Sequence, residues 1–128
     1  MKIGEFLRII KVPNHVNVYC RYIPVCINTT NNSNDDILYN KYKDSTDILC
    51  YRGDENNVLS RFIDCAEYFN KKTIIRVCSD NPFLSLKYME YLIDIYLENN
   101  KDYISYSIDG DKCCMKSHIG IFSEIVSL

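Results

Sequence analysis

Residues 73–82 read TIIRVCSDNP, and this stretch decides the fold class. Its first six residues, Thr73–Cys78, are mainly β-branched and apolar, which favours a buried strand. Asp80 and Pro82 follow, and a helical pattern of apolar residues begins directly after them. Open α/β sheets bind their ligands where a parallel strand runs into a helix. A carboxylate at that point can hold a divalent cation against a phosphate, so the stretch predicts a nucleotide or nucleotide-sugar site.

Segments with strand and helix patterns alternate on both sides of this stretch. In chain order we expect a helix at Ile3–Ile10, a strand at Val16–Ile27, a helix at Asp35–Lys43, a strand at Asp47–Tyr51, a helix at Glu55–Asn70, the Thr73–Cys78 strand, a helix from about Pro82 to Asn99 and a strand at Tyr103–Ile108. Residues Ile119–Leu128 fit either a strand or a short helix. The alternation predicts one α/β domain over residues 1–128, with a mainly parallel sheet and helices on both faces.

The two longest helices each have an apolar stripe that we expect to face the sheet. For the first helix the predicted inward residues are Val58, Leu59, Phe62, Ala66 and Phe69. For the second they are Leu84, Tyr88, Tyr91, Leu92, Ile95 and Tyr96.

The overall composition excludes several classes of protein. The chain has 128 residues and a net charge of −2, with 15 basic and 17 acidic residues mixed along it, so no basic stripe for nucleic acid is present. No run of eighteen apolar residues predicts a membrane span, and the charged N-terminus does not fit a secretory signal. We therefore expect a cytoplasmic protein without nucleic-acid or membrane partners.

The seven cysteines have no Cys-x-x-Cys spacing. Most lie in apolar segments, so we interpret them as small buried side chains of a reducing compartment. Cys113 and Cys114 with His118 could be half of a zinc site. A loop is the better interpretation, because a structural zinc needs four ligands and no second pair is in view.

Three polar loops follow predicted strands and should open on one edge of the sheet: Thr29-Thr30-Asn31, Arg52-Gly53-Asp54 and Ser79-Asp80-Asn81. Hydroxyls and amides suit a base or ribose, arginine suits a phosphate and aspartate suits a metal. Each group also has a plainer interpretation. Asp80 could cap the next helix, Gly53-Asp54 could be only a turn and a helix cap, and the threonines could be strand formers.

Other motifs point to chemistry more weakly or exclude it. Asp109-Gly110-Asp111 has the Asp-x-Asp spacing of metal-dependent glycosyltransferases, but Asp-Gly between strands is more often a tight turn. His15 and His118 have no evident partner. The four glycines cannot form a dinucleotide fingerprint or a P-loop.

Three runs of sequence, in the same order, resemble the cytidylyltransferases that activate acidic sugars, in particular the spore coat polysaccharide biosynthesis protein F group. Residues 25–31 read VCINTTN and are followed by Asp35-Asp36. Residues 51–62 read YRGDENNVLSRF, close to the family run Arg-Gly-x-Glu-x-x-Val-Leu-x-Arg. Residues 75–84 read IRVCSDNPFL, with Asp102-Tyr103-Ile104-Ser105 behind them.

This resemblance implies a Rossmann-like nucleotidyltransferase sandwich of three layers that transfers CMP from CTP to an acidic sugar of a surface polysaccharide. It implies that Asp80 binds Mg²⁺ and that the nucleotide and sugar lie near Thr29, Thr30, Arg52, Asn81 and Arg61. It identifies no catalytic residue and allows a homodimer. Because in-line attack on a phosphate depends mainly on charge neutralisation and positioning, a metal-bound aspartate is a sensible centre.

The family's first strand and its Gly/Arg/Lys-rich triphosphate loop should precede the Ile3–Ile10 helix, where this chain begins. We therefore expect the central strand, between the Tyr22–Ile27 and Thr73–Cys78 strands, to be missing. The resulting hypothesis is a fragment or truncated relative that is inactive, or nearly so, on its own. Two rival hypotheses are a glycosyltransferase that uses Asp109 and Asp111, and a non-catalytic module that binds a nucleotide or a partner chain.

Overall fold

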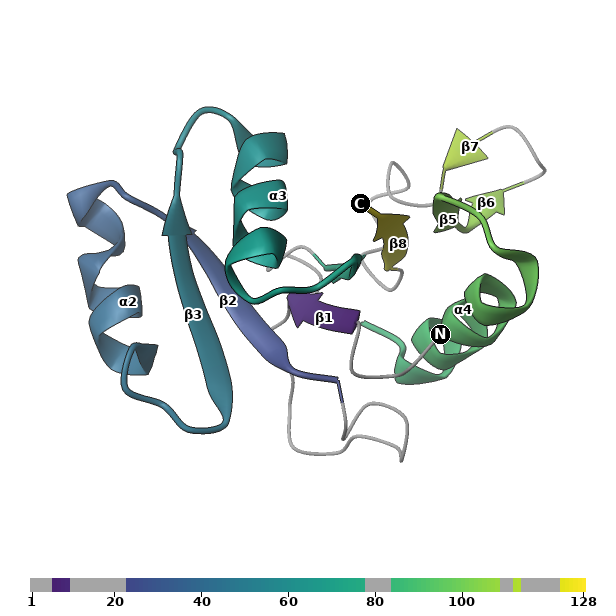
Figure 1. Cartoon of the computed structure of the whole chain (residues 1–128), viewed down its shortest axis with the longest axis horizontal. Helices are drawn as coiled ribbons and strands as arrows, with labels where there is room; N and C mark the ends of the chain where they lie inside the picture. The colour runs from purple at the N-terminus through teal and green to yellow at the C-terminus, as the bar shows by residue number, and fades with distance from the viewer. Residues whose placement is uncertain (1–5, 10–22, 78–83, 109–111, 114–122) are drawn as a thin grey trace.

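The computed structural model describes residues 6–9, 23–77, 84–108, 112–113 and 123–128. These residues form a six-stranded sheet in the order β3-β2-β1-β4-β8-β5 (Figure 1). Its strands are β1 (Phe6–Ile9), β2 (Val25–Thr30), β3 (Ile48–Gly53), β4 (Thr73–Arg76), β5 (Tyr103–Ser105) and β8 (Glu124–Ser127). The helices are η2 (Ser33–Asp35), α2 (Asp36–Tyr42), α3 (Val58–Tyr68) and α4 (Leu86–Asn99). A small hairpin pairs β6 (Ser107–Ile108) with β7 (Lys112–Cys113).

The sheet has a parallel part and an antiparallel end. β1 pairs in parallel with β2 and with β4, and β2 pairs in parallel with β3. β8 runs antiparallel to both of its neighbours, β4 and β5. The predicted α/β class, with a mainly parallel sheet and helices on both faces, is confirmed.

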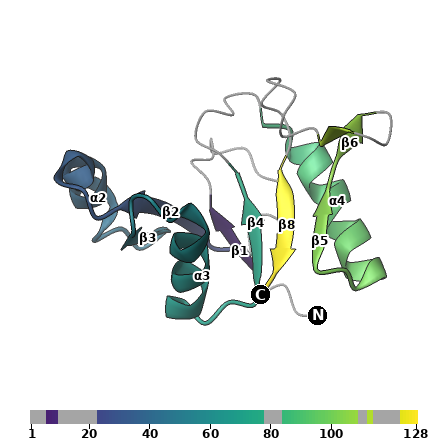
Figure 2. The ribbon, with the colours of Figure 1, turned by 90° about the horizontal axis from the view of Figure 1, so that it is seen from above.

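The alternation of side chains along β4 separates two hydrophobic cores. Ile74 packs with Cys26, Cys65 and Ala66 beneath α3. Ile75 points to the other face and packs with a larger cluster. The buried members of that cluster are Ile23, Ile75, Val77, Met89, Leu92, Ile93, Tyr96 and Ile125. α4 covers the β8 and β5 end of this second face, far along the sheet from α2 (Figure 2).

The segment that we expected to be a helix at Ile3–Ile10 contains strand β1. Residues Phe6–Ile9 pair with Thr73–Arg76, and Arg8 pairs with Val25, so β1 lies between β2 and β4. Both the predicted helix and the predicted loss of the central strand were therefore wrong. An apolar run this short satisfies a helical and a strand pattern equally. A strand at this position also hydrogen-bonds to both β2 and β4. Without it, the backbone N–H and C=O groups along the facing edges of these two strands would have no strand partner.

The remaining elements follow the predicted order, with shifted ends. Ile119–Leu128, left open between strand and helix, contains strand β8. The single strand predicted at Tyr103–Ile108 is divided, because Tyr103–Ser105 pairs with β8 whereas Ser107–Ile108 pairs with β7. α4 begins at Leu86 with Ser85 as its N-cap, so the plain interpretation of Asp80 as the cap of this helix was wrong.

The predicted inward faces of the two long helices were only partly correct. In α3, Cys65 and Ala66 are buried, but Val58 and Leu59 are 42% and 70% exposed. In α4 the buried stripe is Met89, Leu92, Ile93 and Tyr96. Tyr88 and Tyr91 lie at the surface, where a tyrosine can keep its hydroxyl in water.

Candidate functional site

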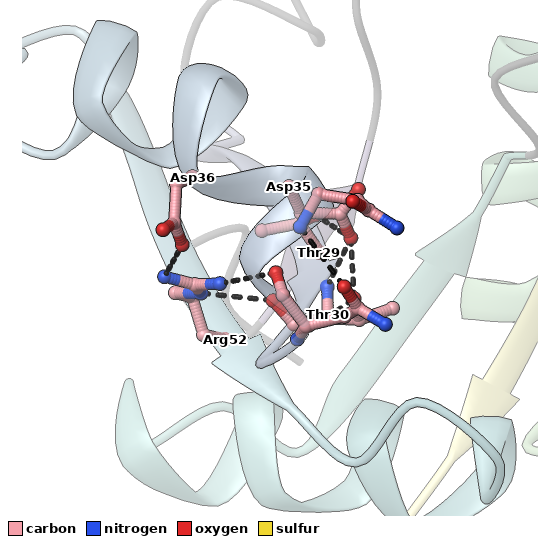
Figure 3. Close-up of polar contacts among 7 residues, drawn as sticks. Thr29, Thr30, Asp35, Asp36 and Arg52 are labelled. Carbon is pink, nitrogen blue, oxygen red and sulfur yellow. Dashed lines mark hydrogen bonds and ion pairs between the residues drawn. The ribbon is translucent and has the colours of Figure 1, made fainter.

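The carboxyl ends of β2 and β3 meet in register at one edge of the sheet. Thr29 pairs with Arg52, Thr30 pairs with Gly53, and the Asn31 amide donates to the Gly53 carbonyl at 2.9 Å. Two of the three loops predicted to converge are therefore side by side. We call six residues the β2–β3 rim: Thr29, Thr30, Asn32, Asp35, Asp36 and Arg52. All of them except Asn32 are labelled in Figure 3.

Asp35 is the acceptor at the centre of the rim. Its Oδ2 accepts from the Thr29 hydroxyl at 2.8 Å, from the Thr30 amide at 3.0 Å and from the Thr30 hydroxyl at 2.5 Å. These bonds, the Thr30 hydroxyl first, lower the pKa of the Asp35 carboxyl, and the Arg52 charge adds to them. We expected Asp35 only to start a helix. The two threonines that donate to it lie six and five residues before it, outside the usual spacing of a local side-chain turn, so no simple sequence signal pointed to these bonds.

Arg52 holds the same turn from its other side. Its Nε donates to the Thr30 carbonyl at 2.8 Å, and its Nη2 donates to the Asn32 carbonyl at 2.7 Å. Its Nη1 forms an ion pair with Asp36 at 2.7 Å (Figure 3). The guanidinium also lies over the Tyr39 ring, 5.1 Å from its centroid. These contacts give Arg52 a role in fixing the shape of the turn.

Arg61 lies next to the rim, near the N-terminal end of α3. Its Nη1 donates to the Asp54 carbonyl at 2.8 Å, and its own carbonyl accepts from Asn28 Nδ2 at 3.2 Å. A methyl group on Gly53 would come 2.7 Å from Arg61 Cγ, so glycine permits this close packing. In the described part of the chain, two buried polar atoms here have no partner: Asn28 Oδ1 and Arg61 Nε.

The turn expected at Gly53-Asp54 is present. The Asp54 carboxylate accepts from the Asn56 and Asn57 amides at 2.8 and 2.7 Å, and these bonds lower the pKa of Asp54. Asn57, not Asp54, is the N-cap of α3, and its side chain accepts from the Ser60 amide at 3.0 Å.

Among the sequence-predicted site residues, the structure brings Thr29, Thr30 and Arg52 into one network with Arg61 nearby. Asp80 and Asn81 lie outside the described residues. So do Asp109, Asp111, His15 and His118, and nothing is described of the Cys113 and Cys114 side chains. Within the described ranges no three Asp, Glu, His or Cys side chains gather to hold a metal ion.

A second feature that sequence reasoning missed lies under α3, at the β4–β8–β5 end of the sheet. A cavity of about 440 Å³ has mostly apolar walls and one polar patch. We call it the α3 groove. Its lining residues are Val58, Leu59, Phe62, Ile63, Ile74, Arg76, Tyr103, Glu124, Val126 and Leu128.

The polar patch of the α3 groove is an ion pair held by a tyrosine. Arg76 Nη1 lies 2.5 Å from Glu124 Oε1, and the Tyr103 hydroxyl donates to Glu124 Oε2 at 2.7 Å. The Glu124 side chain is only 8% exposed, whereas that of Arg76 is 35% exposed and lies over the Phe62 ring. The direct pairing of Arg76 with Glu124 across β4 and β8 explains why a charged residue is tolerated in each of these strands.

In the part of the chain that the structure describes, the helices are too short and too polar to cross a membrane.

A mainly parallel α/β sheet, with polar loops gathered at the carboxyl ends of its strands, defines a Rossmann-like class of nucleotide-binding fold. Within that class the chain belongs to the cytidylyltransferase family, whose model matches residues 9–116. The predicted resemblance is therefore confirmed.

Two curated relatives and one solved structure are also similar to this chain. The spore coat polysaccharide biosynthesis protein SpsF of Bacillus subtilis is 29% identical over 101 residues, which is 79% of this chain and 38% of that protein. An uncharacterized protein of Methanocaldococcus jannaschii, MJ1063, is 33% identical over 61 residues, 48% of this chain and 25% of that protein. A cytidylyltransferase structure from Leptospira borgpetersenii matches with a TM-score of 0.61 at 20% identity, covering 86% of this chain and 44% of that one. The chain thus spans between a quarter and just under half of these proteins.

Proposed function

We propose that the β2–β3 rim is the nucleotide side of a cytidylyltransferase site, which accepts CTP and serves the transfer of CMP to an acidic sugar with release of pyrophosphate. The observation that carries this proposal is the in-register ending of β2 and β3, which brings Thr29, Thr30 and Arg52 into one network. Family membership supports the nucleotide, and the similarity to SpsF supports a sugar of a surface polysaccharide.

The hydrogen bonds of the rim suit a ligand that donates. The hydroxyl protons of Thr29 and Thr30 go to Asp35, and Thr30 Oγ1 also accepts from the Asn32 amide at 3.3 Å. The remaining hydrogen-bonding capacity of the two hydroxyls is therefore to accept. Ribose hydroxyls and the amino group of cytosine are donors of the matching kind. Behind the rim, Arg61 Nε and Asn28 Oδ1 are a buried donor and a buried acceptor that have no partner among the residues that the structure describes. Such atoms are expected where a ligand or water completes the bonding.

Asp80 remains the proposed carboxylate for Mg²⁺, because the described acidic residues of the rim are already engaged. Asp35 accepts from the two threonines, and Asp36 pairs with Arg52. Mg²⁺ bound there would neutralise phosphate charge during transfer.

Calorimetric titration with CTP and Mg²⁺ tests the proposal. Thr30→Val keeps the shape of the side chain and removes the hydroxyl, and Asp80→Asn removes the charge. We expect each to weaken CTP binding at least roughly tenfold, which corresponds to about 1.4 kcal/mol. Thr46→Val, on the exposed turn before β3, is the matched control and should bind CTP normally. A chain that does not bind CTP, or variants that bind it equally well, would contradict the proposal.

Turnover is a separate question, because these 128 residues contain no glycine-rich triphosphate loop. We expect CTP binding with little or no pyrophosphate release when the chain is given CTP, Mg²⁺ and an acidic sugar. Release of pyrophosphate at ordinary enzyme rates would contradict the hypothesis that the chain is inactive, but it would not contradict the proposed nucleotide site.

A further inference from the structure

Two cysteines that are 39 positions apart in sequence are in contact inside the protein. Cys26 lies on β2 and Cys65 lies on α3, and their Sγ atoms are 3.5 Å apart. Both side chains are fully buried, with Ala66 and Ile74 around them. A disulfide has an S–S length of about 2.05 Å, so the sulfurs need to approach by roughly 1.5 Å to bond.

Cys50 is the other cysteine whose side chain the structure describes, and it is poorly placed to compete. It lies on β3 between Leu49 and Tyr51, and both of those side chains pack against the cluster under α3. Because successive strand residues point to opposite faces, Cys50 points away from that cluster. Among the described cysteines, Cys26 and Cys65 are therefore the pair that is pre-arranged for bonding.

We propose that Cys26 and Cys65 form an internal disulfide when the chain reacts with a small-molecule disulfide, so that this pair is a thiol modification site joining β2 to α3. One cysteine thiolate attacks the reagent, whose S–S bond breaks, and a mixed disulfide and one small thiolate result. The second cysteine then attacks the mixed disulfide and expels the other small thiolate. Two protein thiols are oxidised, one reagent disulfide is reduced, and the two protein protons end on the two small thiols.

The environment makes this reaction slow in the native state. The hydrogen bond with Cys65 and burial both raise the pKa of the Cys26 thiol, so little thiolate exists at neutral pH. The reagent also reaches the sulfurs only when α3 separates from the sheet. The rate of bonding should therefore rise with pH and with low concentrations of urea.

The bond would connect the elements that carry the proposed nucleotide site. Cys26 is three residues before Thr29, and Cys65 is one helical turn after Arg61, whose carbonyl already accepts from Asn28 on β2. The disulfide closes the chain from β2 through α2 and β3 to α3. By the usual loop-entropy relation, closing a loop of this length should raise the Tm of the chain by about 10 °C.

The test is incubation of the full chain with oxidised glutathione at mildly alkaline pH, followed by intact-mass measurement, peptide mapping and thermal unfolding. We expect loss of two hydrogen atoms, a single linked pair of peptides containing Cys26 and Cys65, and a higher Tm than in the reduced chain. Cys50→Ala should still form the bond, and Cys65→Ala should not.

Thermal unfolding of the wild-type chain before and after oxidation does not depend on any variant folding. A chain in which Cys26 and Cys65 stay reduced while other cysteines react would overturn the proposal. Linkage of either residue mainly to another cysteine, or a linked chain that melts no higher, would also overturn it.

Discussion

The two ends of the sheet are built on different principles. At the β2–β3 rim, polar groups bond to one another: Asp35 accepts from both threonines, and Arg52 binds two carbonyls and Asp36. At the β4–β8 end, the α3 groove is mainly apolar and has one ion pair at its base. The conformation of the rim is thus fixed by hydrogen bonds among its own residues. The α3 groove, in contrast, is a cavity that the surrounding side chains do not fill.

α3 serves both regions, and this explains its pattern of exposure. Arg61 faces the rim side and donates to the Asp54 carbonyl. Val58 and Leu59 face the groove and remain largely exposed, although they are among the most apolar residues of the helix. Apolar exposure of this kind costs stability, whereas the hydrogen bonds of the rim add to it. The rim should therefore tolerate a ligand without rearranging, and its integrity should depend on a few polar side chains.

The largest effect is expected at the base of the groove. Glu124→Ala leaves Arg76 and the Tyr103 hydroxyl without their shared acceptor, and Glu124 is almost fully buried. Loss of the two hydrogen bonds to this buried carboxylate should lower the free energy of unfolding by about 3 kcal/mol. Urea unfolding measures this loss. Glu124→Gln keeps the shape and one acceptor oxygen and should lose less. Equal stability of all three chains would show that the ion pair does not support this end of the sheet.

The next effect is expected at the rim. Arg52→Ala removes two hydrogen bonds to carbonyls and the ion pair with Asp36, and should lower the free energy of unfolding by about 2 kcal/mol. Arg52→Lys keeps the charge but cannot reach all three acceptors in one plane, so it should recover only part of the loss. If lysine restores full stability, charge alone is sufficient and the planar fork is not needed.

A smaller effect is expected where the rim meets α3. Gly53→Ala would place a methyl group 2.7 Å from Arg61 Cγ and 3.1 Å from the Tyr51 ring, so the side chains must shift. We expect a loss of about 1 kcal/mol in unfolding free energy. In an Arg61→Ala background the Cγ atom is gone, and the same change should cost less. If Gly53→Ala lowers the free energy of unfolding equally in the wild-type and Arg61→Ala chains, its cost does not come from the contact with Arg61.

The smallest effect is a pH dependence that distinguishes the rim. Hydrogen bonds lower the pKa of Asp35 in the folded chain below its ordinary value of 3.8. Asp35 therefore adds stability above its unfolded pKa, and this stability is lost as pH falls through the lower folded pKa. The Tm difference between wild type and Asp35→Asn should shrink as pH falls from about 6 to 3. If this Tm difference instead grows as the pH falls, the folded chain does not favour the ionised form of Asp35.

The order of elements was predictable because each long segment has one clear apolar period. β3, α3, β4 and α4 were recognised in this way. Phe6–Ile9 was misread because four residues cannot separate a period of 3.6 from a strand, and only its pairing with β2 and β4 decides the matter.

The convergence of Thr29, Thr30 and Arg52 followed from topology alone, because parallel strands end at the same edge. The bonds made there did not follow. Arg52 was expected to be available for a phosphate, but each of its three guanidinium nitrogens already has a partner in the turn or in α2. Two further contacts join residues that are far apart in sequence: Cys26 with Cys65, and Arg76 with Glu124. No local sequence pattern indicates such pairs.

The most direct test of the rim as a nucleotide site is an amide NMR titration of the isotope-labelled chain with CTP and Mg²⁺. Shift changes should concentrate at Thr30–Asn32 and Arg52–Asp54, with little change at the groove residues Leu59, Phe62 and Val126. Changes confined to the groove, or the absence of any change at saturating CTP, would contradict the assignment of the nucleotide site to the ends of β2 and β3.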